Sequence, residues 1–164
     1  MEHDAAADRP KNAGFRLMQR LMHIYWRVSR GMTLGVRAVA LSADGQILLV
    51  RHSYTEGWHF PGGGVEPGES LLDALGKELR EEANVRMTGA PALHGVFFNA
   101  HVSRRDHVAV FVVRDFEVLG PHVPDREILE ARLFPLAALP EGVTPGTARR
   151  LAEVTARAPV SERW

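Results

Sequence analysis

The spacing of hydrophobic and polar residues along the chain predicts its helices and strands. Apolar residues recur every three to four positions in residues 13–30 and 70–83, a spacing typical of amphipathic helices. A third helix is expected to begin after Thr144, an N-cap residue followed by proline, and to run to about residue 157. Segments rich in β-branched and aromatic residues predict strands at 34–41, 46–50, 92–98, 107–118 and 127–134.

The order of these elements indicates the fold class. A turn at 42–45 joins the first two predicted strands, which we expect to pair as a hairpin. Because strands and helices are interleaved, the pattern favours an α/β fold with a mixed sheet and helices on both faces. Residues 1–12, rich in alanine and charge, predict a disordered tail. The prediction is therefore a tail, an N-terminal helix at 13–30 and a single domain over 31–164.

Composition excludes several classes of protein. The 164 residues and 45% hydrophobic content fit one domain. The chain has no cysteine, which excludes disulfides, a thiolate nucleophile and a cysteine-ligated zinc site. It also lacks an apolar run near the roughly 20 residues of a membrane-spanning helix, and its first residues show no signal-peptide pattern. We therefore expect a cytoplasmic protein without a membrane span.

Charge is unevenly distributed, although the 20 basic and 20 acidic side chains balance. Residues 9–37 contain seven basic residues and no acidic one, whereas residues 56–82 contain seven acidic and two basic ones. Three interpretations of the basic amphipathic helix at 13–30 are open. It covers the sheet or the partner in a homodimer, it widens a substrate pocket, or it contacts an anionic membrane or nucleic acid. Four arginines on one face are common on surface helices, so the charge alone does not indicate a nucleic-acid partner.

Three glutamates in the second helix are the first candidates for chemistry. Glu78, Glu81 and Glu82 stand at positions i, i+3 and i+4, so they share one side of the helix within an arc of about 100°. Like charges packed so closely are destabilising unless a cation neutralises them. Carboxylate oxygens suit Mg²⁺ or Mn²⁺, and Mg²⁺ normally shares its coordination shell with substrate phosphates. The alternative is an ordinary solvated acidic face.

A glycine-rich loop precedes this helix. Gly62, Gly63 and Gly64 permit unusual backbone angles and a close approach of the backbone to a ligand. The loop leads into the N-terminal end of the helix that bears the glutamates, and helix N-termini favour anions. Together the loop and the carboxylates indicate a site for a metal-bound diphosphate.

Residues 63–85, GGVEPGESLLDALGKELREEANV, resemble the Nudix box, G-x5-E-x7-R-E-U-x-E-E-x-G-U, where U is aliphatic. Seven of the nine defined positions match: Gly63, Glu69, Glu78, Leu79, Glu81, Glu82 and Val85. Two depart from the pattern, namely Lys77 in place of arginine and Asn84 in place of glycine. The resemblance implies a Nudix-like α/β/α sandwich with the N-terminal helix as an addition.

The same resemblance implies metal-dependent hydrolysis of a nucleoside diphosphate linked to another group. The implied ligands of Mg²⁺, or of Mn²⁺, are Glu78, Glu81, Glu82 and, by position, the backbone carbonyl of Gly62. Glu78 and Glu81 are the first candidates for catalytic residues. Three later acids also qualify as the general base by residue type, and the sequence does not separate them: Asp106, Glu127 and Glu130.

The two departures from the motif differ in their physical effect, since Lys77 weakens a contact whereas Asn84 is conservative. In the family the arginine at position 77 pairs with the loop glutamate, here Glu69, and thereby supports Gly63 and the rest of the loop. Lys77 keeps the charge but loses the bidentate geometry. Asn84 stands at a helix stop that requires a left-handed residue, and asparagine is the best substitute for glycine there.

Candidates for substrate contacts lie in the predicted strand at 92–98 and the loop after it. Aromatic rings stack on bases and arginines pair with phosphates, which points to Phe97, His101, Arg104 and Arg105. The sequence predicts a small-molecule nucleotide or nucleoside diphosphate derivative as the partner. The alternative function is a catalytically silent Nudix-like module that binds or senses a nucleotide.

Overall fold

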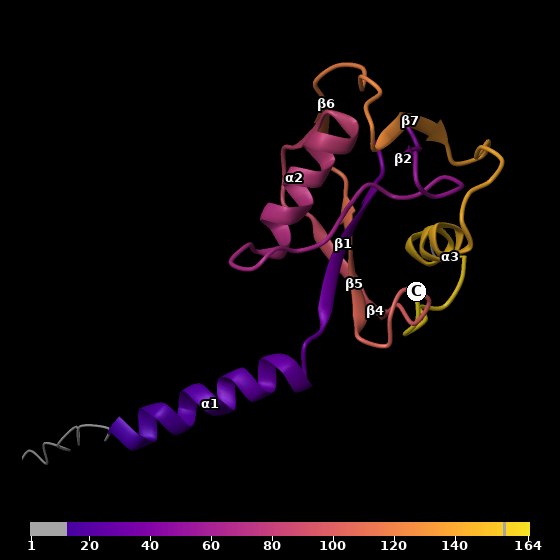
Figure 1. Ribbon diagram of the computed structural model, residues 1–164. Helices are drawn as coiled ribbons and strands as arrows, with labels where there is room; N and C mark the ends of the chain where they lie inside the picture. Colours follow the sequence, from indigo (N-terminus) through magenta and orange to yellow (C-terminus); the bar gives the residue numbers. More distant parts are fainter. Residues whose placement is uncertain (1–12, 156) are drawn as a thin grey trace, which may run out of the picture. The chain divides into compact units, whose positions relative to one another are not determined.

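The computed structural model describes residues 13–155 and 157–164, and the chain divides into two units after Met32. The first unit contains helix α1 (Ala13–Ser29), coloured indigo in Figure 1. Its bounds confirm the N-terminal helix that the sequence predicts. The predicted disordered tail at 1–12 lies outside the described residues.

The second unit contains the mixed sheet. Its elements follow in the order β1 (Thr33–Ala40), β2 (Gln46–His52), α2 (Leu71–Ala83), β3 (Val85–Met87), β4 (Ala92–Phe98), β5 (Asp106–Val113), β6 (Phe116–Val118), β7 (Ile128–Pro135) and α3 (Pro145–Val154). β1 runs parallel to β5, and β4 pairs antiparallel with β5. The pairs β2–β7 and β3–β6 are antiparallel. Parallel and antiparallel pairs therefore both occur, as predicted.

Apolar side chains of the central strands divide between two hydrophobic cores. Val36 and Ala38 of β1 lie in one core with Leu79 of α2. Val39 lies in the other core with Leu151 of α3. Because successive side chains of a strand point to opposite faces, α2 and α3 cover opposite faces of the sheet, as Figure 1 shows. The predicted α/β/α sandwich is confirmed.

β1 and β2 do not form the predicted hairpin. The turn between them is present, since the Ser42 N–H donates to the Gln46 carbonyl oxygen at 2.9 Å and Leu41 forms an isolated bridge with Ile47. Beyond this bridge β1 pairs with β5 and β2 pairs with β7. Both strands carry apolar residues on both faces, so they suit a covered interior rather than a half-exposed hairpin.

The other differences from prediction concern element ends. The strand predicted at 107–118 is interrupted at Asp115, whose carbonyl oxygen accepts from the Thr88 N–H at 2.9 Å. The chain then pairs as β6 with β3, a short strand that the sequence pattern does not predict. Helix α3 begins after Thr144 as predicted but ends at Val154. Among the described helices, none has the length and apolar content that crossing a bilayer requires.

Candidate active site

Side chains fix both ends of α2, the helix that carries the clustered glutamates. At its start the Ser70 hydroxyl accepts from the Asp73 N–H and the Asp73 carboxylate accepts from the Ser70 N–H, which is a capping box. At its end Asn84 has φ 53° and ψ 42°, and its N–H donates to the Arg80 carbonyl oxygen at 3.0 Å. This geometry confirms the prediction that Asn84 serves as the left-handed helix stop.

The glycine loop lies between β1 and α2. Two β1 amides donate to loop carbonyl oxygens at 2.9 Å: Val36 to Gly63, and Ala38 to Pro61. The Gly62 N–H instead donates to Glu82 Oε2 of α2 at 2.7 Å. Within the described part of the chain, no donor reaches the Gly62 carbonyl oxygen. The loop is therefore tied to the strand on one side and to the metal-binding candidate Glu82 on the other.

Close packing explains why glycine stands at two positions of the loop. Gly62 has φ +145°, and a Cβ atom there would overlap the Val36 carbonyl oxygen. A Cβ atom at Gly63 would overlap the carboxylate of Glu78. The absence of side chains at these positions thus lets the loop backbone approach both β1 and the α2 carboxylates.

Burial changes the protonation of the two α2 carboxylates nearest the loop. Glu82 is 8% exposed, and this burial raises its pKa to about 7, against the opposing effects of the Gly62 N–H and of Arg37. Burial also raises the pKa of Glu78, while Lys77 opposes the rise and Glu81 adds to it. The positively charged groups around Glu78 and Glu82 therefore do not fully compensate for the burial of these two carboxylates.

Glu78 and Glu82 line one cavity of about 400 Å³ together with Gly62, Gly63 and Gly64. Other residues that line it include Arg37 of β1, Tyr54 and Glu127. Glu81 is exposed and is not among the described residues that line this cavity. The structure therefore brings two of the three predicted carboxylates, and the predicted loop, to one place.

These residues fit a hard divalent cation. Glu78 and Glu82 supply carboxylate oxygens, both with raised pKa values, and Gly62 supplies a carbonyl oxygen that accepts no hydrogen bond from the described residues. Oxygen ligands of these kinds are the ones that Mg²⁺ and Mn²⁺ prefer. In the described residues, no three His, Cys, Asp or Glu side chains already converge on a common point as a metal cluster. The remaining ligands would therefore come from water and substrate, which is the usual arrangement for Mg²⁺.

Lys77 and Glu69 link the loop to the helix as the motif predicts. Lys77 Nζ lies 3.5 Å from Glu69 Oε1. The other carboxylate oxygen of Glu69 accepts from the Glu66 N–H at 3.0 Å. Glu69 thus holds the loop backbone on one side and the helix side chain on the other, although lysine makes only a single contact.

The structure separates the three later acids that the sequence left equivalent. Glu130 pairs with Arg51 and Arg132, both at 3.2 Å, and does not line the cavity. Asp106 accepts from Thr33 Oγ1 at 2.5 Å and from Asn99 Nδ2 at 2.8 Å. Glu127 lines the cavity, and its carboxylate has no ion-pair partner among the described residues.

A second cavity of about 600 Å³ adjoins the first. Both are lined by Arg37, Tyr54, Asn99, Val102 and Val108. The second is also lined by His101, Trp164, Arg149 and the first residues of α3. None of its described lining residues is acidic. It can accept an anionic or aromatic group that extends from the carboxylate site.

The four predicted substrate residues have different positions. His101 is exposed and lines the second cavity. Phe97 is 1% exposed and packs in the core beneath the Arg150 guanidinium, 3.8 Å from the ring centre, so it is not placed to bind a ligand. Arg104 and Arg105 are exposed in the loop before β5 and do not line either cavity.

Among the cavity-lining residues that the sequence did not single out are Arg37, Tyr54, Asn99 and Trp164. Arg37 carried a detectable signal, because it interrupts the otherwise apolar segment of β1. Trp164 is brought in by contacts between segments far apart in the chain. For Trp164 these are hydrogen bonds between the C-terminal segment and β4, such as Trp164 N–H to the Phe98 carbonyl oxygen at 3.0 Å.

Comparison with solved structures supports the fold. A MutT NUDIX hydrolase from Burkholderia pseudomallei superposes with a TM-score of 0.64 at 24% identity, covering 74% of this chain and 97% of that one. An ADP-ribose pyrophosphatase from Streptococcus suis superposes with a TM-score of 0.58 at 26% identity, covering 80% of this chain and 96% of that one.

Two curated relatives are similar over shorter segments. An RNA pyrophosphohydrolase of Halorhodospira halophila is 40% identical over 67 residues, which cover 38% of this chain and 37% of that protein. The human 8-oxo-dGDP phosphatase NUDT18 is 36% identical over 62 residues, covering 36% of this chain and 19% of that protein. The matched segments thus span well under half of either relative. The model of the NUDIX domain matches residues 31–157, most of the chain, and this protein therefore belongs to the NUDIX family.

Proposed function

We propose that this protein is a Mg²⁺-dependent pyrophosphohydrolase that cleaves a diphosphate linkage in a nucleotide or nucleoside diphosphate derivative. The observation that carries the proposal is the packing of the glycine loop against two carboxylates. Gly62 donates to Glu82, and Gly63 leaves no room for a side chain beside Glu78. This arrangement sets backbone and carboxylate oxygens around one cavity that also contains Arg37.

Glu78, Glu82 and the Gly62 carbonyl oxygen would hold the cation. Glu81, which is exposed beside them on α2, remains a predicted ligand and catalytic residue that can complete the shell through water. When bound, Mg²⁺ lowers the pKa of coordinated water and neutralises charge on the phosphates. Mn²⁺ has the same ligand preference and would substitute for it.

Arg37 would position the phosphates. Its guanidinium lies close enough to Glu78 and Glu82 to lower their pKa values, and it lines both cavities. A substrate that spans both cavities would therefore pass beside this guanidinium. Arginine pairs with phosphate oxygens through two parallel N–H groups, which fixes the orientation of the group being cleaved.

Two carboxylates are placed to accept a proton from the attacking water. Glu78 lies against the loop, and Glu127 approaches the same cavity from the segment before β7. Glu127 is exposed and has no ion-pair partner within the described residues, so its carboxylate is available to accept a proton as a general base. Glu130 is removed from this role by its two arginine partners.

The second cavity would hold the nucleoside. Tyr54 and Trp164 offer aromatic surfaces, and His101 and Arg149 offer hydrogen-bond donors. Asn99 is 7% exposed; its Nδ2 group is bound to Asp106, while its Oδ1 has no partner in the described residues. Asn99 lines both cavities, so its side chain would border the bound group.

The test is product release from a panel of substrates with and without Mg²⁺. The relatives' names refer to RNA and to 8-oxo-dGDP, so the panel includes 5′-triphosphorylated RNA and 8-oxo-dGDP beside nucleoside triphosphates, nucleotide sugars and dinucleotides. We expect hydrolysis of at least one member that chelation abolishes and that Glu78→Gln greatly reduces. Nucleotide binding measured by calorimetry without any product would instead establish the catalytically silent module. Hydrolysis that survives chelation would contradict the metal assignment.

A further inference from the structure

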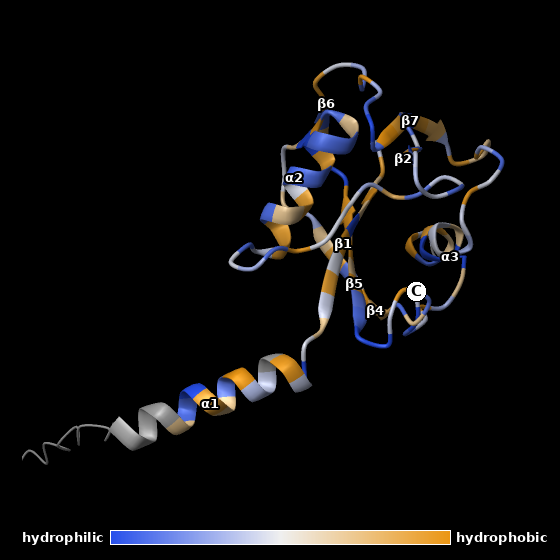
Figure 2. Cartoon of the chain, viewed as in Figure 1, coloured by the Kyte–Doolittle hydropathy of each residue, from blue (hydrophilic) through white to orange (hydrophobic). Residues whose placement is uncertain are grey.

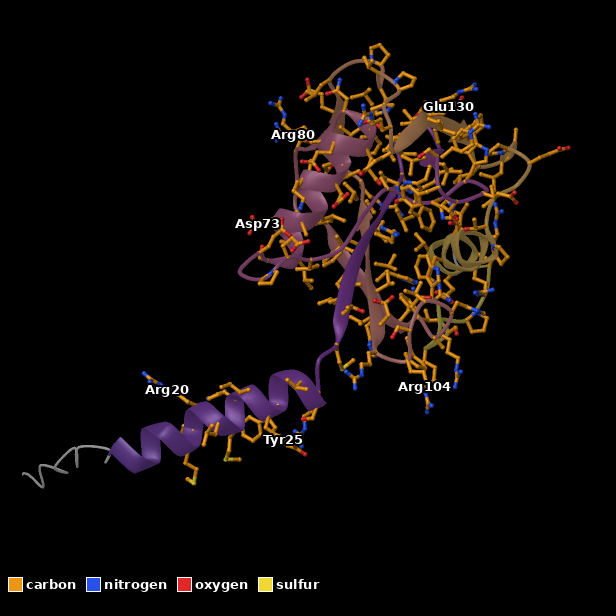
Figure 3. All side chains as sticks on the ribbon, in the orientation of Figure 1. Arg20, Tyr25, Asp73, Arg80, Arg104 and Glu130 are labelled. Carbon is orange, nitrogen blue, oxygen red and sulfur yellow. The ribbon has the colours of Figure 1, made fainter. Side chains whose placement is uncertain are left out.

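Helix α1 takes no part in the proposed chemistry, and its side chains divide into an apolar and a basic side. At about 100° per residue, its bulky apolar residues cover an arc of about 200°; they are Met18, Leu21, Met22, Ile24, Tyr25, Trp26 and Val28. Gln19, Arg20 and His23 occupy the remaining arc, followed by Arg30 beyond the helix end. Figure 2 shows hydrophobic and hydrophilic positions alternating along α1. In Figure 3 Arg20 and Tyr25 project from opposite sides of the helix.

The apolar side of α1 has no partner within its own unit. The seven apolar side chains are between 39% and 73% exposed. In the described part of this unit, α1 is the only element, so no second helix or strand there covers them. Both hydrophobic cores of the second unit are built from residues 36–164. Exposed apolar surface of this extent marks an interaction site.

The charge of the segment indicates the chemistry of the partner. Residues 9–32 contain six basic residues and no acidic one. Within the described residues of α1, Arg20 and His23 lie opposite the apolar side. Trp26 stands at the boundary, and the Arg30 guanidinium lies 5.9 Å from its ring centre. Basic residues on one side, leucine and aromatic residues on the other and a tryptophan at the boundary are typical of helices that lie in a membrane interface.

We propose that α1 binds an anionic lipid bilayer, lying in the plane of the interface with its apolar side toward the acyl chains. The width of the apolar side favours lipid over a second copy of this chain. A partner helix contacts only a stripe along one side of α1, whereas a bilayer can cover an arc of about 200°. Nucleic acid would match the arginines but would leave the apolar side chains in water. The proposal concerns α1 alone and does not rest on the proposed hydrolase activity.

Co-sedimentation of the full chain with vesicles tests the proposal. We expect binding to vesicles of phosphatidylglycerol mixed with phosphatidylcholine and much weaker binding to phosphatidylcholine alone. Replacing Leu21 and Tyr25, at the centre of the apolar side, by glutamine should lower the partition coefficient for the mixed vesicles at least about tenfold. Replacing Arg20 and Arg30 by glutamine should lower the partition coefficient for the mixed vesicles about fivefold or more for each arginine. It should also narrow the difference in partition coefficient between the mixed and the phosphatidylcholine vesicles.

A matched control removes the same charge elsewhere. Arg80 and Arg114 are exposed and lie outside α1, so Arg80→Gln with Arg114→Gln should leave vesicle binding unchanged. The melting temperature of each variant verifies that the second unit remains folded. This readout is independent of any enzymatic activity.

Three results would overturn the proposal. The first is no binding to either vesicle type. The second is binding that the Leu21 and Tyr25 replacements leave unchanged, since that would mean simple charge attraction. The third is a dimer, measured by light scattering, that the same replacements convert to a monomer in the absence of lipid, because a second copy of the chain would then be the partner of the apolar side.

Discussion

His52 Nδ1 lies 3.7 Å from Glu82 Oε1, and both side chains are buried, with 4% and 11% of their side-chain surface exposed. The separation is too long for a hydrogen bond. Burial lowers the pKa of His52 to about 4 and raises that of Glu82 to about 7. Between these values the imidazole and the carboxyl group are both neutral, so they face each other without forming an ion pair.

The opposite pKa shifts of this pair predict how the stability of the metal-free protein depends on pH. Burial raises the folded-state pKa of Glu82 from 4.5, so the contribution of this residue to the free energy of unfolding is present below pH 4.5 and is lost as the pH rises toward 7. Burial lowers the folded-state pKa of His52 from 6.5, so its contribution to the free energy of unfolding is present above pH 6.5 and is lost as the pH falls toward 4. Between about pH 4.5 and 6.5 the free energy of unfolding therefore falls with pH because of Glu82 and rises with pH because of His52.

Replacing one residue of the pair should therefore leave only the other residue's effect on the pH dependence of the free energy of unfolding. In the presence of a chelator, the free energy of unfolding of Glu82→Gln should rise with pH relative to the parent, by about 1 kcal/mol per pH unit. That of His52→Gln should fall relative to the parent by a similar amount. Denaturant titrations at intervals across this window measure both slopes. Parallel pH profiles for the parent and both variants would contradict the assigned pKa shifts.

Metal binding should distinguish Glu82 from Glu69. Glu82→Gln removes a proposed ligand, so both the Mg²⁺-induced rise in melting temperature and the turnover should be largely lost, turnover by orders of magnitude. Glu69→Gln loosens the contact with Lys77 and should lower the melting temperature while keeping most of the response to Mg²⁺. Thermal scans with and without Mg²⁺, beside turnover, measure both. Equal responses to Mg²⁺ in both variants and the parent would place the metal elsewhere.

Adjacent glycines provide a sharper test of the loop geometry. A Cβ atom at Gly63 would overlap the Glu78 carboxylate, whereas one at Gly64 would meet no atom within 4 Å. Gly63→Ala should therefore displace Glu78 and reduce turnover about 100-fold, as misplacement of a catalytic group by about 1 Å does. Gly64→Ala is the matched control and should keep near-parental turnover. If both alanine variants are equally active, Glu78 does not depend on the loop for its position.

Restoring arginine at position 77 should strengthen the link between loop and helix. Lys77→Arg can pair with both oxygens of Glu69, so the melting temperature should rise by roughly 1–2 °C. In the Glu69→Gln background the same replacement should give no rise, and the four proteins together form a double-mutant cycle. A rise that persists without the carboxylate would assign the effect to arginine itself rather than to the pair.

Local sequence determined what could be predicted of this fold. The bounds of α2, its left-handed stop at Asn84 and the contact between Lys77 and Glu69 follow from residues close in the chain. Strand pairing did not follow, because β1 meets β5 more than 60 residues later and the apolar pattern of β1 does not specify which strand it meets. The same limit applies to the site, where Arg37 and Glu127 join α2 from distant segments.

The sequence predicted only part of the substrate site. Because Phe97 and Phe98 point to opposite faces of β4, at most one of them can face a pocket. Phe97 lies in the core beneath Arg150, a residue far along the chain, and Phe98 does not line either cavity. For the same reason the sequence could not reveal that Trp164 reaches the second cavity.

The two adjoining cavities differ in the charge of the side chains that line them. The described acids that line them, Glu78, Glu82, Asp106 and Glu127, all belong to the smaller cavity, and the larger one adds Arg149 and no acid. Under the proposed function, a substrate that spans both would therefore meet an electrical gradient along its length, and only one of its two directions of entry would place its phosphates among the carboxylates. Under the proposed function, substitutions in the larger cavity would therefore change which group the enzyme accepts without reversing which phosphorus atom is presented for attack.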